Sequence, residues 1–300
     1  MLNLKPSFLL MIVAKLISRL PFWVLYGFSD FLFLISYYVV RYRRNLVWNN
    51  LQNSFPDKPE TALHAIEKEF YRNLCDYAVE MVKLLTISPQ ELGRRMVFTN
   101  PEISTKYILE GQSLLNLASH QFNWEWLLAA GSFTLPGQMD FVYQPVNSSF
   151  FNRLSLASRT RFGAYAIKRD EVAREIVKRK NIVRNIALVG DQYPGLKHDK
   201  KYAVTFLNQD TVFFYGANQL AKLTQFPVMY YKLRKIKRGY YETTIVELAK
   251  PPYAKDDHDV LLRYVREIER IVRERPSEWL WSHNRWKKRH IEASADPGNC

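Results

Sequence analysis

A histidine and a glutamate stand close together in the segment LLNLASHQFNWEWLLAA, residues 114–130. The apolar run at 114–118 is typical of a strand, His120 follows it, and Asn123 is well placed to cap a helix. Glu125 would then lie in the first helical turn, where the helix dipole favours a carboxylate and where it can meet His120. Because ligands bind at strand ends in α/β sheets, these residues are the first candidates for a functional site.

This pair of side chains suits the activation of a hydroxyl group. A neutral imidazole can take a proton at neutral pH, and Glu125 could accept a hydrogen bond from the other ring nitrogen and stabilise the imidazolium. The hydroxyl would belong to the substrate, because the sequence has no G-x-S-x-G motif and Cys75 lies on a predicted helix. A structural alternative stays open, in which local hydrogen bonds satisfy His120 and Glu125 is an ordinary acid of a first helical turn.

The elements that must position these residues follow an α/β pattern. Beyond Gly93, short apolar runs typical of buried strands alternate with segments of helical length and periodicity. The pattern predicts a mainly parallel mixed sheet covered by helices on both faces. Strands are expected at 114–118, 141–146, 186–190, 204–207, 227–231 and, as an antiparallel edge, 240–248; helices are expected near 60–85, 124–131, 148–162, 170–180, 215–224 and 256–275.

The N-terminal segment has the composition of a membrane anchor. Residues 22–40 form a 19-residue run whose one charge is Asp30. A helix of that length, at ~1.5 Å per residue, nearly spans a hydrocarbon core of ~30 Å. Pro21 separates this run from a shorter apolar piece at 7–20, and the arginines of 41–44 would hold the C-terminal side in the cytoplasm. A cleaved signal peptide and a buried core helix are the alternatives, the second because Asp30 is costly in lipid.

The chain therefore divides into three expected regions. They are an N-terminal membrane-anchoring segment at 1–44, a helical region at 45–95 and an α/β catalytic domain at 96–300.

Composition narrows the class of partner. The 300 residues include 43 Lys and Arg against 29 Asp and Glu, a formal charge of +14, which indicates an anionic partner such as membrane lipid, an acidic protein or nucleic acid. No RNP, helix-turn-helix or finger signature supports nucleic acid, and no HExxH or clustered Cys/His spacing supports a metal. The basic stretch at 232–238 is either a surface for anionic groups or a solvated face. For Trp279, Trp281 and Trp286, core packing is favoured over membrane anchoring.

The residues around His120 carry a family resemblance. His120-x4-Glu125 resembles the H-x4-D/E motif of glycerolipid acyltransferases, and SHQFNWEW is most similar to the late acyltransferases of bacterial lipid A biosynthesis, the lauroyl and myristoyl transferases. An H-x4-E match alone is weak, but the ordered set of matching segments covers most of the chain and is fairly specific. The set comprises RRNLVWNNLQNSFPDK at 43–58, VYQPVNSSFFNRLSLASRTRFG at 142–163, IKRD at 167–170, LVGDQYPG at 188–195, VTFLNQDTVFFYGANQLAKLTQFPV at 204–228 and PSEWLWSHNRWKKR at 276–289.

The resemblance implies roles for individual residues. His120 would be the general base and Glu125 its partner. Arg169 matches the family's basic residue before an acid, and it would contact the oxyanion or a phosphate unless it forms a surface salt bridge to Asp170 or Glu171. Asp191 follows a predicted strand and either positions substrate or forms a turn. The expected substrate-binding residues are Asn123, Arg169, Asp191 and Gln192, of which the last two match the family's G-D-Q segment.

The sequence departs from the family pattern at two positions. Phe122 stands where Gly is common, which would reshape the loop beside His120, and Tyr193 stands where a second acid is common. Because the role of the missing acid concerns which lipid accepts the acyl group, the resemblance supports acyl transfer more strongly than it supports a particular acceptor.

The family implies transfer of a long-chain fatty acyl group from acyl carrier protein, or from a coenzyme A thioester, to a hydroxyl of a lipid A precursor. The reaction would take place at the bacterial inner membrane, with the catalytic domain facing the cytoplasm. A thioester is already activated, so the enzyme needs a base, positioning and oxyanion stabilisation, and no metal or cofactor is expected. The alternatives are a lysophospholipid or aminolipid acceptor and a non-catalytic, membrane-tethered binding protein.

Overall fold

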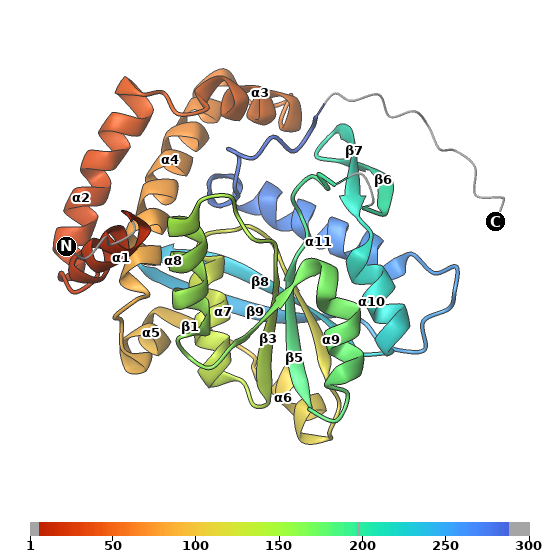
Figure 1. Cartoon of the computed structure of the whole chain (residues 1–300). Helices are drawn as coiled ribbons and strands as arrows, with labels where there is room; N and C mark the ends of the chain where they lie inside the picture. The colour runs from red at the N-terminus through yellow and green to blue at the C-terminus, as the bar shows by residue number, and fades with distance from the viewer. Residues whose placement is uncertain (1–5, 197–198, 288–300) are drawn as a thin grey trace.

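The computed structural model describes residues 6–196 and 199–287, and a seven-stranded mixed sheet lies at its centre (Figure 1). The strand order is β1-β9-β8-β2-β5-β3-β4. Their bounds are β1 Met96–Phe98, β2 Leu114–Ala118, β3 Gln138–Tyr143, β4 Tyr165–Lys168, β5 Arg184–Val189, β8 Val228–Lys237 and β9 Tyr240–Ala249. The helices are α1 Pro6–Ile17, α2 Phe22–Leu34, α3 Arg44–Ser54, α4 Glu60–Lys83, α5 Pro89–Arg95, α6 Glu102–Leu109, α7 Trp124–Thr134, α8 Ser149–Thr160, α9 Val172–Lys178, α10 Gly216–Thr224 and α11 Asp259–Glu274.

The sheet confirms the predicted mainly parallel arrangement. Every neighbouring pair of strands is parallel except β8 and β9, which pair antiparallel as expected. The expected edge position of β9 is wrong, because β1 pairs parallel to its outer side. A strand of three residues is too short to show a periodic pattern, which is why the sequence did not reveal β1.

The run expected at 204–207 also differs from the expectation of a buried strand. It belongs to β6 (Lys201–Phe206), which pairs antiparallel with β7 (Gln209–Phe214) as a separate two-stranded sheet. Side chains of β6 alternate between exposed and partly exposed positions until Phe206, so this hairpin lies on the surface of the domain.

Helices cover both faces of the main sheet, as the continuous apolar strands predict. On β2, Leu115 and Leu117 join a core cluster that includes Tyr264 of α11, whereas Leu114 joins a second cluster that includes Trp126 of α7. Successive residues of a strand point to opposite faces, so these two clusters are the two sides of one sheet. The first cluster also contains Phe33 from α2 and Phe70 from α4, and it therefore joins the three expected regions into one core.

The N-terminal apolar helix forms as expected and is interrupted at Pro21. α2 continues as a π-helical turn over Ile35–Val39, and Phe22–Val39 is long and apolar enough to cross a membrane by length and composition. Only 22% of this stretch is buried in the protein, which argues against an ordinary core helix. Its buried side faces α4, and the two helices run side by side at one edge of the molecule (Figure 1).

The tryptophans near the C-terminal end of the described chain belong to the core. Trp279 and Trp281 are buried, and Trp286 packs against the same cluster while remaining partly exposed. The predicted core packing is therefore confirmed.

Candidate functional site

The loop after β2 is fixed by the first turn of α7. Asn123 caps this helix as predicted, because its Oδ1 accepts hydrogen bonds from the backbone N–H groups of Glu125 and Trp126, both at 3.1 Å. Its Nδ2 donates to Glu80 of α4 at 2.8 Å, and the side chain is fully buried. Both polar ends of Asn123 are thus engaged inside the protein, which leaves the predicted substrate contact without a free atom.

His120 lies in this loop and meets Asp191 rather than Glu125. The Nδ1 of His120 is 2.5 Å from Oδ1 of Asp191, and its backbone N–H donates to Oδ2 at 2.9 Å. The indole N–H of Trp279 donates to the same Oδ2 at 2.7 Å. Three donors therefore fix the carboxylate against the histidine.

Sheet register explains why Asp191 is the partner. β2 and β5 are adjacent and parallel, and Ala118 lies opposite Val189. Two residues beyond this pair, the chains reach His120 and Asp191, so the same edge of the sheet presents both side chains. The predicted hydrogen bond between His120 and Glu125 is corrected accordingly, because none joins them in the part of the chain that the structure describes.

The electrostatics of the pair leave Nε2 of His120 as the nitrogen that can accept a proton. Burial, the largest influence, would raise the pKa of Asp191, but His120 and the hydrogen bonds from His120 and Trp279 hold this pKa below its ordinary value. An ionised carboxylate accepts the proton of Nδ1, which makes Nε2 the unprotonated acceptor of the neutral ring. Among the described residues, no side chain or backbone group hydrogen bonds to Nε2.

Glu125 forms a different ion pair in the wall of the same cavity. Arg159 of α8 donates from Nε to Oε2 at 2.7 Å and from Nη2 to Oε1 at 2.6 Å, and the indole of Trp124 donates at 3.0 Å. Burial would raise the pKa of Glu125, but Arg159 lowers it below the ordinary value, so the carboxylate stays charged. Sequence reasoning missed Arg159, because it lies 34 residues away on another helix and belongs to no recognisable spacing.

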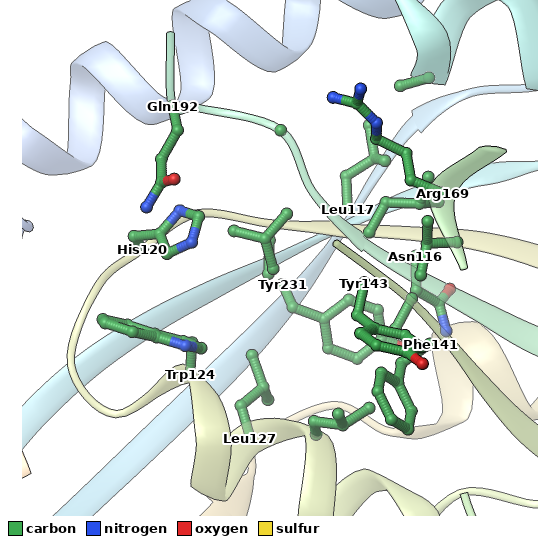
Figure 2. Close-up of a pocket in the computed structure, with 18 of the residues that line it drawn as sticks. Asn116, Leu117, His120, Trp124, Leu127, Phe141, Tyr143, Arg169, Gln192 and Tyr231 are labelled. Carbon is green, nitrogen blue, oxygen red and sulfur yellow. The ribbon is translucent and has the colours of Figure 1, made fainter. Parts of the chain in front are cut away.

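A cavity of about 400 Å³ opens beside His120 (Figure 2). Most of its lining is apolar and comes from both the sheet and α7, with Asn116 of β2 as a buried polar residue among it, so the space suits an alkyl chain. The apolar walls include Phe98, Leu127, Leu128, Leu135, Met139, Phe141 and Tyr231; the polar lining includes His120, Glu125, Arg159, Arg169 and Gln192.

The remaining predicted site residues line this cavity at different places. Figure 2 shows Gln192 next to His120 and Arg169 across the cavity from them. Arg169 forms an ion pair with Asp199 at 2.9 Å, not with the acids that follow it in sequence, and about a fifth of its side chain stays exposed (22%). The structure therefore brings His120, Asp191 and Gln192 together and holds Arg169 apart.

The two departures from the family pattern are accommodated locally. Phe122 is buried and stacks on Phe70 of α4, with ring centroids 6.0 Å apart. The backbone N–H of Tyr193 donates to Nε2 of His283 at 3.0 Å. Burial, followed by the nearby His120, lowers the pKa of His283 to about 4, so His283 is a neutral acceptor that holds the loop after Asp191.

The family model for bacterial lipid A biosynthesis acyltransferases matches residues 2–288, which is nearly the whole chain. The chain belongs to this family. Membership in this acyltransferase family implies an acyl donor and a lipid acceptor. A search of curated proteins finds no match. Within the described residues, no group of three or more His, Cys, Asp or Glu side chains is arranged to hold a metal ion.

Proposed function

We propose that this acyltransferase moves a long-chain fatty acyl group from a thioester, carried by acyl carrier protein or coenzyme A, to a hydroxyl of a lipid A precursor. The reaction takes place at the bacterial inner membrane, with the catalytic domain facing the cytoplasm. The single observation that carries this proposal is the His120–Asp191 pair beside an apolar cavity, in a chain of this family.

His120 is the general base of the first step. Its Nε2 takes the proton of the acceptor hydroxyl while the oxygen attacks the thioester carbonyl carbon. The imidazolium that forms is stabilised by Asp191, 2.5 Å from Nδ1. A carboxylate that is buried and held by three donors needs no rearrangement as the positive charge develops.

The second step expels the thiol. The tetrahedral carbon carries an oxyanion, and the amide of Gln192, beside His120 in Figure 2, is the donor we assign to it. The carbon–sulfur bond then breaks, and the departing thiolate takes the proton from His120. The products are an ester and a free thiol, and the imidazole returns to its neutral state.

Other groups position the two substrates. The apolar walls of the cavity hold the acyl chain, and we assign to Arg169, which lines the same cavity, the contact with a phosphate of the acceptor or donor. The buried Glu125–Arg159 pair holds α8 against α7 and shapes the wall near His120. Glu125 is therefore a positioning residue in this proposal, and Asp191 takes the role of the acid that orients the base.

Mass spectrometry of lipids from cells with and without the gene tests the acceptor, and thiol release with purified protein tests the chemistry. We expect lipid A from cells with the gene to carry one more acyl chain than lipid A from cells without it. We expect a folded His120→Ala variant to lose acyl transfer. Unchanged lipid A with an altered phospholipid or aminolipid would refute the acceptor and leave the chemistry standing. Transfer that survives in His120→Ala would refute the mechanism.

A further inference from the structure

Exposed apolar side chains are concentrated on one part of the molecule. Of the 27 large hydrophobic residues that are exposed in the described part of the chain, 16 lie between Phe8 and Tyr42, on α1, on α2 and just after them. Trp23 and Val39, near the two ends of the stretch Phe22–Val39, are 78% and 76% exposed. A concentration of exposed apolar side chains of this kind marks a contact with another molecule or with lipid.

The opposite side of α2 is fastened to α4 along its whole length. At the N-terminal end of α2, Lys83 donates to the carbonyl of Leu20 at 2.8 Å. In the middle, Ser29 donates to Asp76 at 2.7 Å. Further polar contacts join Thr86 to the carbonyl of Ser18, Tyr26 to Glu80, Tyr37 to Glu67 and Tyr71 to the carbonyl of Tyr42. One side of α2 therefore contacts the rest of the protein along the length of the helix, and the opposite, outward side carries the exposed apolar residues.

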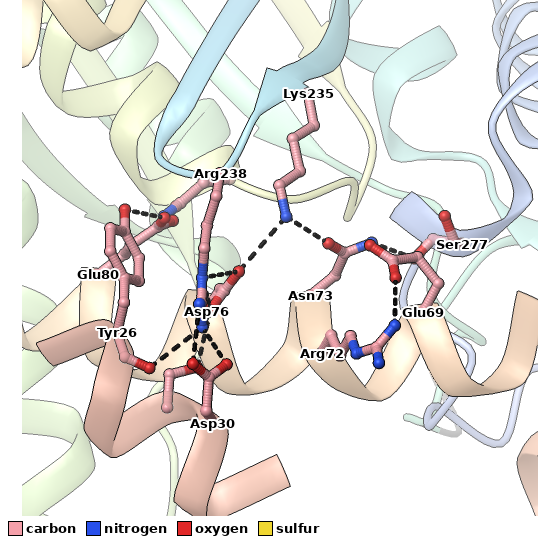
Figure 3. A network of polar contacts seen from close by, with 12 residues as sticks. Tyr26, Asp30, Glu69, Arg72, Asn73, Asp76, Glu80, Lys235, Arg238 and Ser277 are labelled. Carbon is pink, nitrogen blue, oxygen red and sulfur yellow. Dashed lines mark hydrogen bonds and ion pairs between the residues drawn. The ribbon is translucent and has the colours of Figure 1, made fainter. Parts of the chain in front are cut away.

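The charge in the middle of α2 belongs to this attachment. Arg238, in the turn between β8 and β9, donates to Asp30 at 2.7 Å and to Asp76 of α4 at 2.7 Å (Figure 3). Lys235 of β8 also donates to Asp76, at 3.3 Å. Asp30 stands about halfway along Phe22–Val39, so a hairpin tip with several charges lies level with the middle of the apolar helix.

This arrangement is incompatible with a helix that crosses a bilayer. If α2 spanned the membrane, Asp30, Arg238, Lys235 and Asp76 would lie near the midplane of the hydrocarbon, where charges are costly. α4 would have to enter the bilayer as well, together with charged residues that are exposed or partly exposed, such as Arg72, Lys68 and Glu69.

We infer that α1 and α2 lie in the plane of the membrane and enter one leaflet only. Their outward apolar sides face the acyl chains, and α4 with the β8–β9 turn holds their inner sides at the headgroup level. Exposed Lys15, Arg19, Arg41 and Arg43 flank the apolar surface, so the fitting partner is a bilayer rich in anionic lipid. This inference rests on the proposed membrane location and not on the proposed reaction.

The same surface leads towards the cavity. α1 contacts α8, and Phe151 near the start of α8 is 57% exposed. Val146, three residues before α8, lines the cavity and is also exposed. A lipid acceptor in the outer part of the leaflet can thus approach His120 without leaving the membrane surface.

Cysteine labelling in spheroplasts tests the topology. In the full chain with Cys75→Ala and Cys300→Ser, single variants Leu20→Cys and Val40→Cys place a thiol just outside each end of the stretch Phe22–Val39, and Leu109→Cys on α6 reports the side of the domain. We expect a membrane-impermeant maleimide to label none of the three from outside and all three after detergent lysis. External labelling of only Leu20→Cys or only Val40→Cys would show a span and overturn the inference. External labelling of all three would keep the in-plane arrangement and refute the proposed cytoplasmic side.

A second measurement identifies what covers the apolar surface. Phe31 is 56% exposed on the outward side of α2, and Leu109, 75% exposed on α6, provides the matched control. We expect Phe31→Asp to lower partition into phosphatidylglycerol vesicles at least tenfold, and Leu109→Asp to leave this partition unchanged. We expect the parent chain to bind neutral vesicles more weakly than phosphatidylglycerol vesicles. Unchanged partition in Phe31→Asp, together with loss of a cross-linked dimer, would show that a second copy covers this surface and would overturn the inference.

Discussion

Replacing Asp191 with Asn removes the charge that orients His120 while keeping the size of the side chain. Oδ2 of Asp191 accepts two hydrogen bonds, from the backbone N–H of His120 and from the indole N–H of Trp279, whereas Oδ1 faces Nδ1 of His120. The amide oxygen of an Asn must face these two donors, so its NH₂ group faces Nδ1 of His120. Nδ1 then becomes the acceptor, the proton moves to Nε2, and the ring can no longer take a proton from the substrate hydroxyl.

The size of the effect follows from the lost charge and the wrong tautomer. Two opposite charges ~4 Å apart at an effective dielectric constant of ~20 attract by about 4 kcal/mol, which corresponds to about 10³ in rate. In a Ser-His-Asp triad, the corresponding change of Asp to Asn lowers kcat by about 10⁴. We therefore expect Asp191→Asn to lower kcat by about 10³ to 10⁴ with little change in KM.

The assay follows thiol release and ester formation with purified protein, an acyl thioester and the lipid acceptor. Trp279→Phe is the milder companion variant, because it removes one donor to Asp191, and we expect a loss of about tenfold, the cost of one hydrogen bond. Glu125→Gln is the discriminating control. If Asp191→Asn keeps kcat within tenfold while Glu125→Gln loses 10³ or more, Glu125 orients the base and the reasoning from sheet register is refuted.

Three further predictions concern stability, pH and chain length. Arg159→Ala leaves the buried Glu125 without its cation and should lower the free energy of unfolding by about 3–5 kcal/mol in denaturant titrations, whereas a loss below 1 kcal/mol would contradict a buried pair. Burial raises the pKa of Glu80 to about 7 from an ordinary 4.5, so the stability that Glu80 contributes should be complete below pH 4.5 and decline by about 3 kcal/mol as pH rises through 7. The difference in stability between the parent chain and Glu80→Gln should therefore change over this range, and a difference that does not depend on pH would refute the prediction. Leu128→Phe narrows the cavity and should shift the preferred donor to shorter acyl chains in a competition assay, and an unchanged preference would place the chain elsewhere.

Local elements around the site were predictable because the signals are local. The apolar run LLNLA gives β2, and Asn123 followed by a helical pattern gives the cap of α7. Asp191 was recognisable as a residue at a strand end. Its partnership with His120 depends on the pairing of β2 with β5, 71 residues apart along the chain, and periodicity gives the existence of strands and not their order.

The attachment of the N-terminal helix shows the same limit. The length and composition of residues 22–40 predict a membrane segment. A hydropathy pattern does not reveal that Tyr26, Ser29 and Tyr37, on one side of this segment, donate hydrogen bonds to buried carboxylates of α4. The charge of Asp30 is unfavourable in a helix that spans a bilayer, whereas in a helix packed on the domain it forms an ion pair with Arg238. Only the position of Arg238, more than 200 residues later, distinguishes the two.

The contacts of Glu80 bear on any attempt to prepare a water-soluble enzyme by removing the first 44 residues. This one carboxylate accepts hydrogen bonds from Tyr26 of α2 at 2.9 Å, from Tyr241 of β9 at 2.7 Å and from Asn123, the cap of α7, at 2.8 Å. Trimming the N-terminus would uncover the carboxylates of Glu67, Asp76 and Glu80 together and loosen the loop that carries His120. Solubility is better sought by polar substitutions on the outward side of α2, which leave those partners in place.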